Sequence, residues 1–140
     1  MQIAREGSTI FLKMDAGENV RDTILDVVKK ENITSGEITW GIGRIRSLEV
    51  GYLKGRNYEK VTFNELMEIV SFHGSIAAND PILHIHCSGA GSDYRISGGH
   101  FFNGIADPLM EVSIRIFTSI TMGRVENKKS GIMELNLVRS

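Results

Sequence analysis

The sequence predicts an α+β fold, a largely antiparallel β-sheet of seven to nine strands with one main helix after the first strand. Two observations lead to this prediction. Apolar residues recur with helical spacing in only one segment, residues 19–31. Most of the remaining chain consists of short alternating or apolar runs separated by turns, as expected for strands. No internal repeat, linker or low-complexity segment interrupts the chain, so residues 1–140 are expected to form a single domain.

The first strand is expected at residues 9–14, a short apolar run between glycine-containing turns. The helix is expected over residues 19–31. Asn19 is a suitable N-cap residue, and Asp22 follows it three positions later, within the first turn. The apolar positions with helical spacing are Val20, Ile24, Leu25, Val27 and Val28.

After the helix, the sequence predicts strands almost to its end. In one of them Ile38, Trp40 and Ile42 alternate with Gly41 and Gly43, which places the apolar side chains on one face and the glycines on the other. Glycines inside a strand indicate that another backbone or side chain packs closely there. The expected strands are residues 37–45, 47–53, 58–63 (an edge strand), 65–77, 82–88, 109–116, 121–125 and 133–137. The last two, joined by a hairpin turn, are expected to complete the same sheet.

Three of the four histidines are the main functional feature. His84 and His86 are two positions apart in an apolar run, so a strand would place both imidazoles on one face. His100 follows a Gly-Gly pair, far enough along the chain for a turn and a neighbouring strand to return it to the same place. Three converging neutral imidazoles form a natural site for a divalent metal. Zinc is the first choice, because three imidazoles and an open position suit it, and iron, nickel or manganese are the alternatives.

Other residues near these histidines have simpler interpretations. The histidines themselves could instead be hydrogen-bonded strand residues in a groove or residues facing solvent. Cys87 is expected on the opposite strand face as a small buried hydrophobe. His73 is expected at the surface or at an interface rather than as a fourth ligand. Glu111 and Asp93 are the candidate carboxylates to orient the ligands.

Composition limits the classes of partner. The chain has 16 Lys and Arg against 17 Asp and Glu, a net charge of −1, so it has no overall attraction for nucleic acid or anionic membranes. The chain contains two Gly-x-Gly sequences, at residues 41–43 and 89–91. Neither lies between a strand and the start of a helix, so neither is expected to bind phosphate. No segment approaches the roughly 18 apolar residues of a membrane span, and the first residues lack the apolar core of a signal peptide. A cytoplasmic protein is expected.

The ordered set of motifs resembles the PPC domain family, which is conserved between plants and prokaryotes, and in particular its stand-alone prokaryotic members. The resemblance implies an α+β fold that assembles as a homotrimer. It also implies that His84, His86 and His100 form the histidine cluster that is the candidate metal site of prokaryotic members. The motifs that carry the resemblance are residues 12–18, 33–36, 40–43, 68–74, 84–86 and 98–100.

Plant members of this family bind DNA, which gives the alternative function, a DNA-binding or regulatory protein. Those members carry AT-hooks built on Arg-Gly-Arg-Pro, a tetrapeptide that this chain lacks. Their Gly-Arg-Phe-Glu-Ile motif corresponds here to residues 65–69, which keep only Glu68 and Ile69. DNA is therefore not expected as a partner without a separate DNA-binding segment.

The expected function is thus that of a metal-binding homotrimer, with zinc as the expected cofactor, that acts on or senses a small molecule. A purely structural role, in which the histidines tie subunits together, is the third possibility. Neither the reaction, if there is one, nor the physiological role follows from the sequence.

Overall fold

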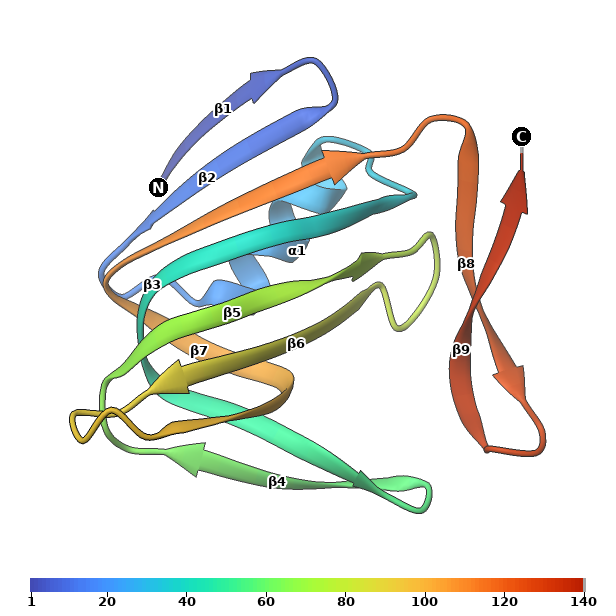
Figure 1. Ribbon diagram of the computed structural model, residues 1–140. Coiled ribbons are helices and arrows are strands. Elements are labelled where there is room, and N and C mark those ends of the chain that lie inside the picture. Colours follow the sequence, from blue (N-terminus) through green and yellow to red (C-terminus); the bar gives the residue numbers. More distant parts are fainter. Residues whose placement is uncertain (140) are drawn as a thin grey trace.

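The chain forms nine strands and one helix within residues 1–139, the part that the computed structural model describes (Figure 1). This confirms the expected fold class. The elements are β1 (Gln2–Glu6), β2 (Thr9–Asp15), α1 (Val20–Lys30), β3 (Gly36–Lys54), β4 (Asn57–Phe63), β5 (Met67–Ile76), β6 (Leu83–Ala90), β7 (Ile96–Ile116), β8 (Ile120–Asn127) and β9 (Ile132–Arg139).

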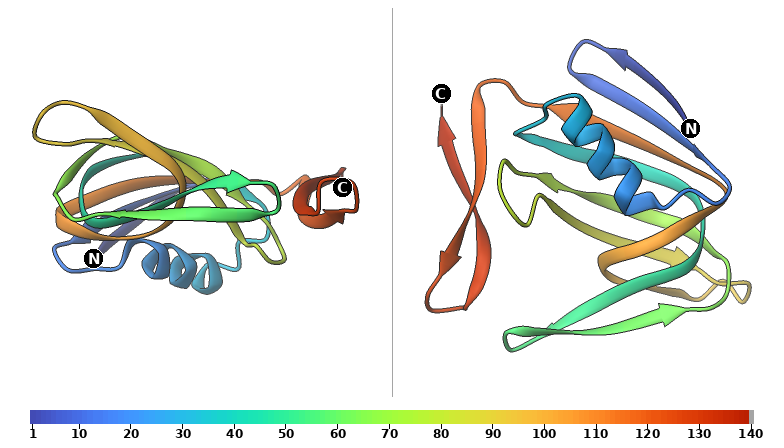
Figure 2. Two further views of the ribbon diagram at one scale, coloured as in Figure 1. Left: turned by 90° about the horizontal axis from the view of Figure 1, so that it is seen from below. Right: turned by 180° about the vertical axis from the view of Figure 1, so that it is seen from behind.

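The helix α1 has the expected N-terminus. The side-chain oxygen of Asn19 accepts a hydrogen bond of 3.0 Å from the backbone N–H of Asp22, an N-cap that typically stabilises a helix by about 1 kcal/mol. One face of α1 is buried against the sheet, which it covers on one side only (Figure 2). Its buried side chains are Val20, Ile24, Val27 and Val28. No helix within residues 1–139 is long and apolar enough to cross a membrane.

Seven strands form one antiparallel sheet in the order β1-β2-β7-β6-β5-β3-β4. The strand β3 also pairs with β7, so that β7, β6, β5 and β3 form a closed ladder. The hydrophobic core lies inside this curled sheet and beneath α1, with Phe72 and Phe101 in edge-to-face contact at a centroid distance of 5.0 Å. The closed ladder is what brings β6 and the first half of β7 side by side.

Two strands are longer than the sequence indicates. Segments 37–45 and 47–53 are parts of the single strand β3, and segment 109–116 is the second half of β7. The ladder between β3 and β7 contains several register shifts, and Ser47 has a positive φ of 54°. Bulges of this kind bend a strand without ending its pairing. The first strand, β1, was not expected because all five of its residues are exposed at the sheet edge and show no apolar period.

The expected alternation around Trp40 is wrong in one respect. Ile38 is buried, whereas Trp40 and Ile42 are 41% and 49% exposed. A register shift between Ile38 and Trp40 adds a residue to β3 and turns the following side chains to the outer face. The expected close packing at the glycine is confirmed, because a Cβ at Gly41 would lie 2.8 Å from the Phe72 ring.

The last two strands do not complete the main sheet, contrary to the sequence-based expectation. β8 and β9 pair only with each other, and their hairpin lies beside the sheet (Figures 1 and 2). The reason lies at the end of β7, where Arg115 pairs with Thr9 on β2 and Ile116 pairs with Gly36 on β3. Both edges of β7 are therefore occupied at the point where the chain leaves the sheet.

Candidate metal centre

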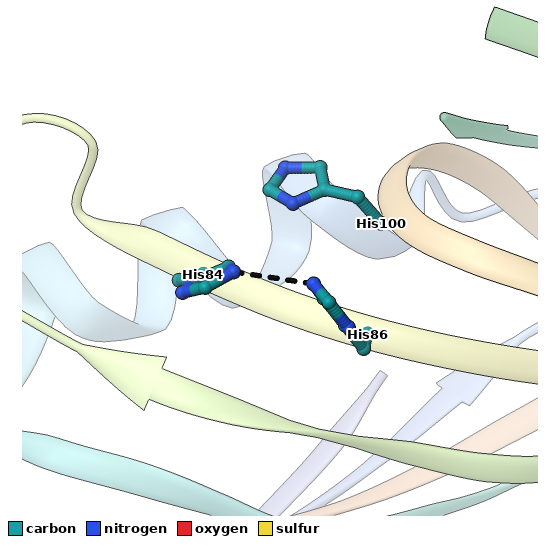
Figure 3. A group of neighbouring side chains, drawn as sticks. All are labelled: His84, His86 and His100. Atoms are coloured by element: carbon teal, nitrogen blue, oxygen red, sulfur yellow. Dashed lines mark hydrogen bonds between the residues drawn. The ribbon is translucent and has the colours of Figure 1, made fainter. Parts of the chain in front are cut away.

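The structure brings the three predicted histidines together. His84 and His86 lie on β6 and His100 lies on β7, and one ring nitrogen of each is within 4.8 Å of the others. The Nε2 atoms of His84 and His86 point toward one another, and His100 extends from the neighbouring strand (Figure 3). Within residues 1–139, no other group of three or more histidine, cysteine or acidic side chains has this proximity.

Strand alternation orients the two histidines of β6. Leu83, Ile85 and Cys87 are buried in the core, so His84 and His86 between them point to the outer face. His86 is also the register partner of His100 on β7. Directly paired residues of antiparallel strands point to the same face, which explains why the third imidazole joins the other two.

The Gly-Gly pair before His100 allows β7 to approach both of its neighbours. A Cβ at Gly98 would lie 2.7 Å from the Cα of Ser88 on β6, and a Cβ at Gly99 would lie 2.6 Å from the carbonyl oxygen of Gly51 on β3. Real side chains do not tolerate such distances from backbone atoms. A larger residue at either position would push β7 away from its neighbours and displace His100.

The three imidazoles form a compact group with one further contact. The Nε2 atoms of His84 and His86 are 3.2 Å apart, and the ring centroids of the group are separated by 5.0 to 5.6 Å. The Nδ1 atom of His100 lies 3.3 Å from the hydroxyl oxygen of Tyr58, which comes from the edge strand β4. Sequence reasoning missed Tyr58, because no local pattern links it to a histidine so distant in the chain.

The local environment favours neutral imidazoles. Burial lowers the pKa of His100 to about 4, with smaller contributions from the nearby charges of His84, His86, Arg21 and Lys60. Burial likewise lowers the pKa of His84, helped by His86 and Arg124. Both side chains are therefore uncharged near neutral pH. Neutral imidazole is the form that binds metal, so protons compete little with a cation at these two positions.

The structure separates this group from the other candidate residues. Cys87 is buried on the opposite face of β6, as expected, and burial raises the pKa of its thiol to about 12. His73 is exposed on β5, where it pairs with His86 across the two strands. Its ring nitrogens do not belong to the group formed by His84, His86 and His100. Asp93 pairs with Arg95 at 3.5 Å.

Glu111, the other carboxylate considered from the sequence, borders a separate cavity beside Trp40. Neither it nor Asp93 has a hydrogen bond to the histidines among the described residues. Tyr58 supplies the contact that a carboxylate was expected to make.

Two cavities adjoin the histidines. One, of about 600 Å³, is bordered by Glu37, Thr39 and His73 together with His84 and His86. The other, of about 350 Å³, is bordered by His84 and His100 and by residues of α1, β4, β8 and β9. His84 therefore borders both spaces.

Comparisons with known proteins agree with this architecture. A Bacteroides thetaiotaomicron protein whose name proposes a DNA-binding role is 24% identical, with 96% of each chain covered and a TM-score of 0.89. A plant- and prokaryote-conserved (PPC) protein from Pyrococcus horikoshii is 22% identical over 99% of this chain and 96% of that chain, with a TM-score of 0.83. A metal-containing protein from Archaeoglobus fulgidus is 25% identical over 96% of this chain and 97% of that chain, also with a TM-score of 0.83.

A search of curated protein sequences finds no match. The model of one protein family, in contrast, matches residues 1–118, a range that contains β1 to β7 and all three clustered histidines. The match extends over well more than half of the chain and agrees with the fold shared with the solved structures. The chain therefore belongs to the family of the Plants and Prokaryotes Conserved (PCC) domain, also abbreviated PPC.

Proposed function

We propose that this protein binds one divalent metal ion, with zinc as the first choice, through His84, His86 and His100. The observation that carries the proposal is the convergence of three ring nitrogens within 4.8 Å on one face of two paired strands. The Archaeoglobus fulgidus neighbour, described as metal-containing, supports the same assignment. Three nitrogen ligands with a free coordination position are typical of zinc sites that remain open to a small molecule.

The geometry requires only a small adjustment. Zinc–nitrogen distances of about 2.0–2.1 Å in a tetrahedral site place ligand nitrogens roughly 3.3 Å apart. The Nε2 atoms of His84 and His86 already have a separation of 3.2 Å. A ring nitrogen of His100 lies within 4.8 Å of those of His84 and His86 and would have to move closer to them, and the Nδ1 of His100 is 3.3 Å from the Tyr58 hydroxyl oxygen. An ion held by these histidines, which border two cavities, would supply a Lewis acid for a small molecule bound there.

Metal analysis of protein purified without an affinity tag tests this proposal. We expect about one zinc ion per chain in the wild-type protein. The outer-shell partners of a zinc ligand are typically worth about 10-fold to 100-fold in metal affinity, so loss of a ligand itself in His86→Ala should weaken zinc binding by about 100-fold or more. The matched control is His73→Ala, which removes the fourth histidine from the neighbouring strand. Full occupancy in His86→Ala, or equal loss in both variants, would contradict the ligand assignment.

We also propose that the protein is a homotrimer, as the resemblance to the PPC family implies, and the β8–β9 hairpin supports an association between copies of the chain. A two-stranded hairpin is marginally stable alone in water, and this one pairs with no other strand of the described chain. Its exposed apolar side chains need a covering surface, which a second copy of the chain would supply. Those that do not line the cavity next to the histidines are Ile120, Val125, Leu135, Leu137 and Val138.

Light scattering tests the assembly. We expect a mass near three times the chain mass of 15.5 kDa for the wild-type protein. Leu137→Glu, at a side chain that is 60% exposed in the single chain, should reduce that mass without loss of the monomer's secondary structure. A wild-type mass equal to that of one chain at working concentration would refute the assembly. An unchanged mass for Leu137→Glu would show that the hairpin is not part of the interface.

DNA binding is the weaker alternative. The name of the Bacteroides thetaiotaomicron neighbour proposes that role for that protein. The metal assignment rests on a side-chain arrangement in this chain itself, and for that reason we prefer it.

A further inference from the structure

Three arginines border the smaller of the two cavities beside the histidines. Arg21 comes from α1, Arg56 from the turn between β3 and β4, and Arg124 from β8, so three segments distant in sequence bring positive charge to one place. The residues that line this cavity include no aspartate or glutamate. Within residues 1–139, no carboxylate lies within 4.0 Å of any of the three guanidinium groups.

Arg124 is unusual because it is buried without a countercharge. The residue is only 6% exposed. Its Nε donates to the carbonyl oxygen of Pro81 at 3.1 Å, and its Nη2 donates to the hydroxyl of Ser75 at 2.9 Å. These bonds fix the guanidinium but leave it with no anionic partner and leave the two N–H groups of Nη1 available. Within residues 1–139 no buried side-chain nitrogen or oxygen lacks a hydrogen-bond partner, so Nη1 is accessible to solvent and can donate to an anion that enters the cavity.

The other two arginines are held near the same space. Arg56 packs against the turn of the β8–β9 hairpin, where a Cβ at Gly131 would lie 2.6 Å from its Nε. Arg21, on α1, borders the same cavity as His100. Much of the remaining lining of the cavity is apolar and aromatic, and includes Leu83, Tyr58, Phe102, Ile132 and Met133.

We propose that this cavity binds a small organic anion, a molecule with one carboxylate or phosphate group attached to an apolar or aromatic body. The anionic group is held by Arg124 with Arg21 and Arg56, since guanidinium groups recognise carboxylate and phosphate through paired N–H donors. The apolar body packs on Tyr58 and Phe102. A volume of about 350 Å³ lies at the lower end of the range for small-molecule sites and fits a metabolite-sized molecule. This inference rests on the proposed function in one respect: His84 and His100 border the cavity, so the ligand would lie next to the bound metal.

Calorimetric titration of the full chain, metal-free and zinc-loaded, tests the assignment with three probes that share a phenyl ring. Phenyl phosphate and benzoate carry the two possible anionic groups, and benzyl alcohol is the neutral control. We expect at least one anionic probe to bind with a Kd of about 1 mM or tighter, and benzyl alcohol to bind more than about tenfold more weakly. The tighter of the two anions identifies the charged group of the natural ligand class.

Variants then locate the site. Arg56→Gln, at an exposed residue with no hydrogen bond to lose among the described residues, should weaken anion binding by about tenfold or more, the usual effect of losing a hydrogen bond to a charged group. Arg124→Lys retains a charge but not the planar donors, and should weaken binding as well. Arg95→Gln, at an exposed arginine outside the cavity lining, is the matched control and should bind like the wild type.

The outcomes separate this inference from the proposed function. Zinc binding without binding of either anion overturns the inference and leaves the metal site standing. Anion binding that depends on Arg56, in a protein that binds no zinc, keeps the cavity assignment and overturns the metal site. Equal weakening by Arg56→Gln and Arg95→Gln, or equal affinity for benzoate and benzyl alcohol, overturns the anion assignment.

Discussion

The contact between Tyr58 and His100 gives a direct test of how the site is held. The Tyr58 hydroxyl oxygen is 3.3 Å from His100 Nδ1, and the two ring centroids are 4.5 Å apart. Tyr58 also packs edge-on against Phe102 at 5.2 Å. Tyr58→Phe keeps both ring contacts and removes only the hydroxyl group, so that any change in metal binding reports on the hydrogen bond.

The expected effect of Tyr58→Phe is a moderate loss of zinc affinity. Partners of this kind fix the tautomer and ring orientation of a metal-binding histidine, and their removal typically lowers metal affinity by about 10-fold to 100-fold. The net value of one hydrogen bond, about 0.5–1.5 kcal/mol, corresponds to a factor of about 2 to 13. The oxygen–nitrogen distance of 3.3 Å is long for a hydrogen bond, and the ring packing remains in the variant. We therefore expect an effect where the two ranges overlap, which is zinc binding weakened by about tenfold.

A competition titration against a chromophoric zinc chelator measures this difference. Tyr52→Phe is the matched control, because Tyr52 is 73% exposed and has no hydrogen bond from its hydroxyl among the described residues. Circular dichroism should show the same fold for both variants. Zinc affinity of Tyr58→Phe within about twofold of the wild type would refute the reasoning, since a factor of two is the lower limit for a net hydrogen bond. An equal loss in Tyr52→Phe would refute it too.

Three further predictions concern protonation, packing and nucleic acid. In metal-free protein, NMR titration should give His100 a midpoint near pH 4, because burial lowers its pKa to that value, and a midpoint near 6.5 would contradict this. Between pH 6.5 and about pH 4, the unfolded chain therefore binds more protons at His100 than the folded chain does. The free energy of unfolding, measured in urea, should fall as the pH decreases from 6.5 to about 4. Gly41→Ala should lower the free energy of unfolding by about 1–3 kcal/mol, because the new methyl group would lie only 2.8 Å from the Phe72 side chain and 2.9 Å from that of Met110. An unchanged urea midpoint would contradict this steric overlap. An anisotropy titration with duplex DNA in about 150 mM salt should show no specific binding, since the chain has no excess of basic residues, and submicromolar binding that persists against competitor DNA would favour the regulatory alternative.

The sequence by itself determined the features that depend on local periodicity. The helix and its Asn19 cap were predictable because both follow from residues within one turn of each other. The opposite faces of His86 and Cys87 follow from alternation along a single strand. His100 was also within reach of the sequence, because the Gly-Gly pair before it marks a strand that passes close to its neighbours.

The tertiary structure decided everything that depends on pairing between distant strands. The extra residue in β3 reversed the faces of Trp40 and Ile42, because a register shift is fixed by the partner strand and leaves no mark in the alternation itself. The β8–β9 hairpin left the main sheet because both edges of β7 were already occupied. Tyr58 and the three arginines, Arg21, Arg56 and Arg124, come from three separate segments, namely α1, the β3–β4 hairpin and β8. Their side chains meet beside the histidines only because the closed ladder and its covering helix and hairpin bring those segments together, a long-range arrangement that no local pattern specifies.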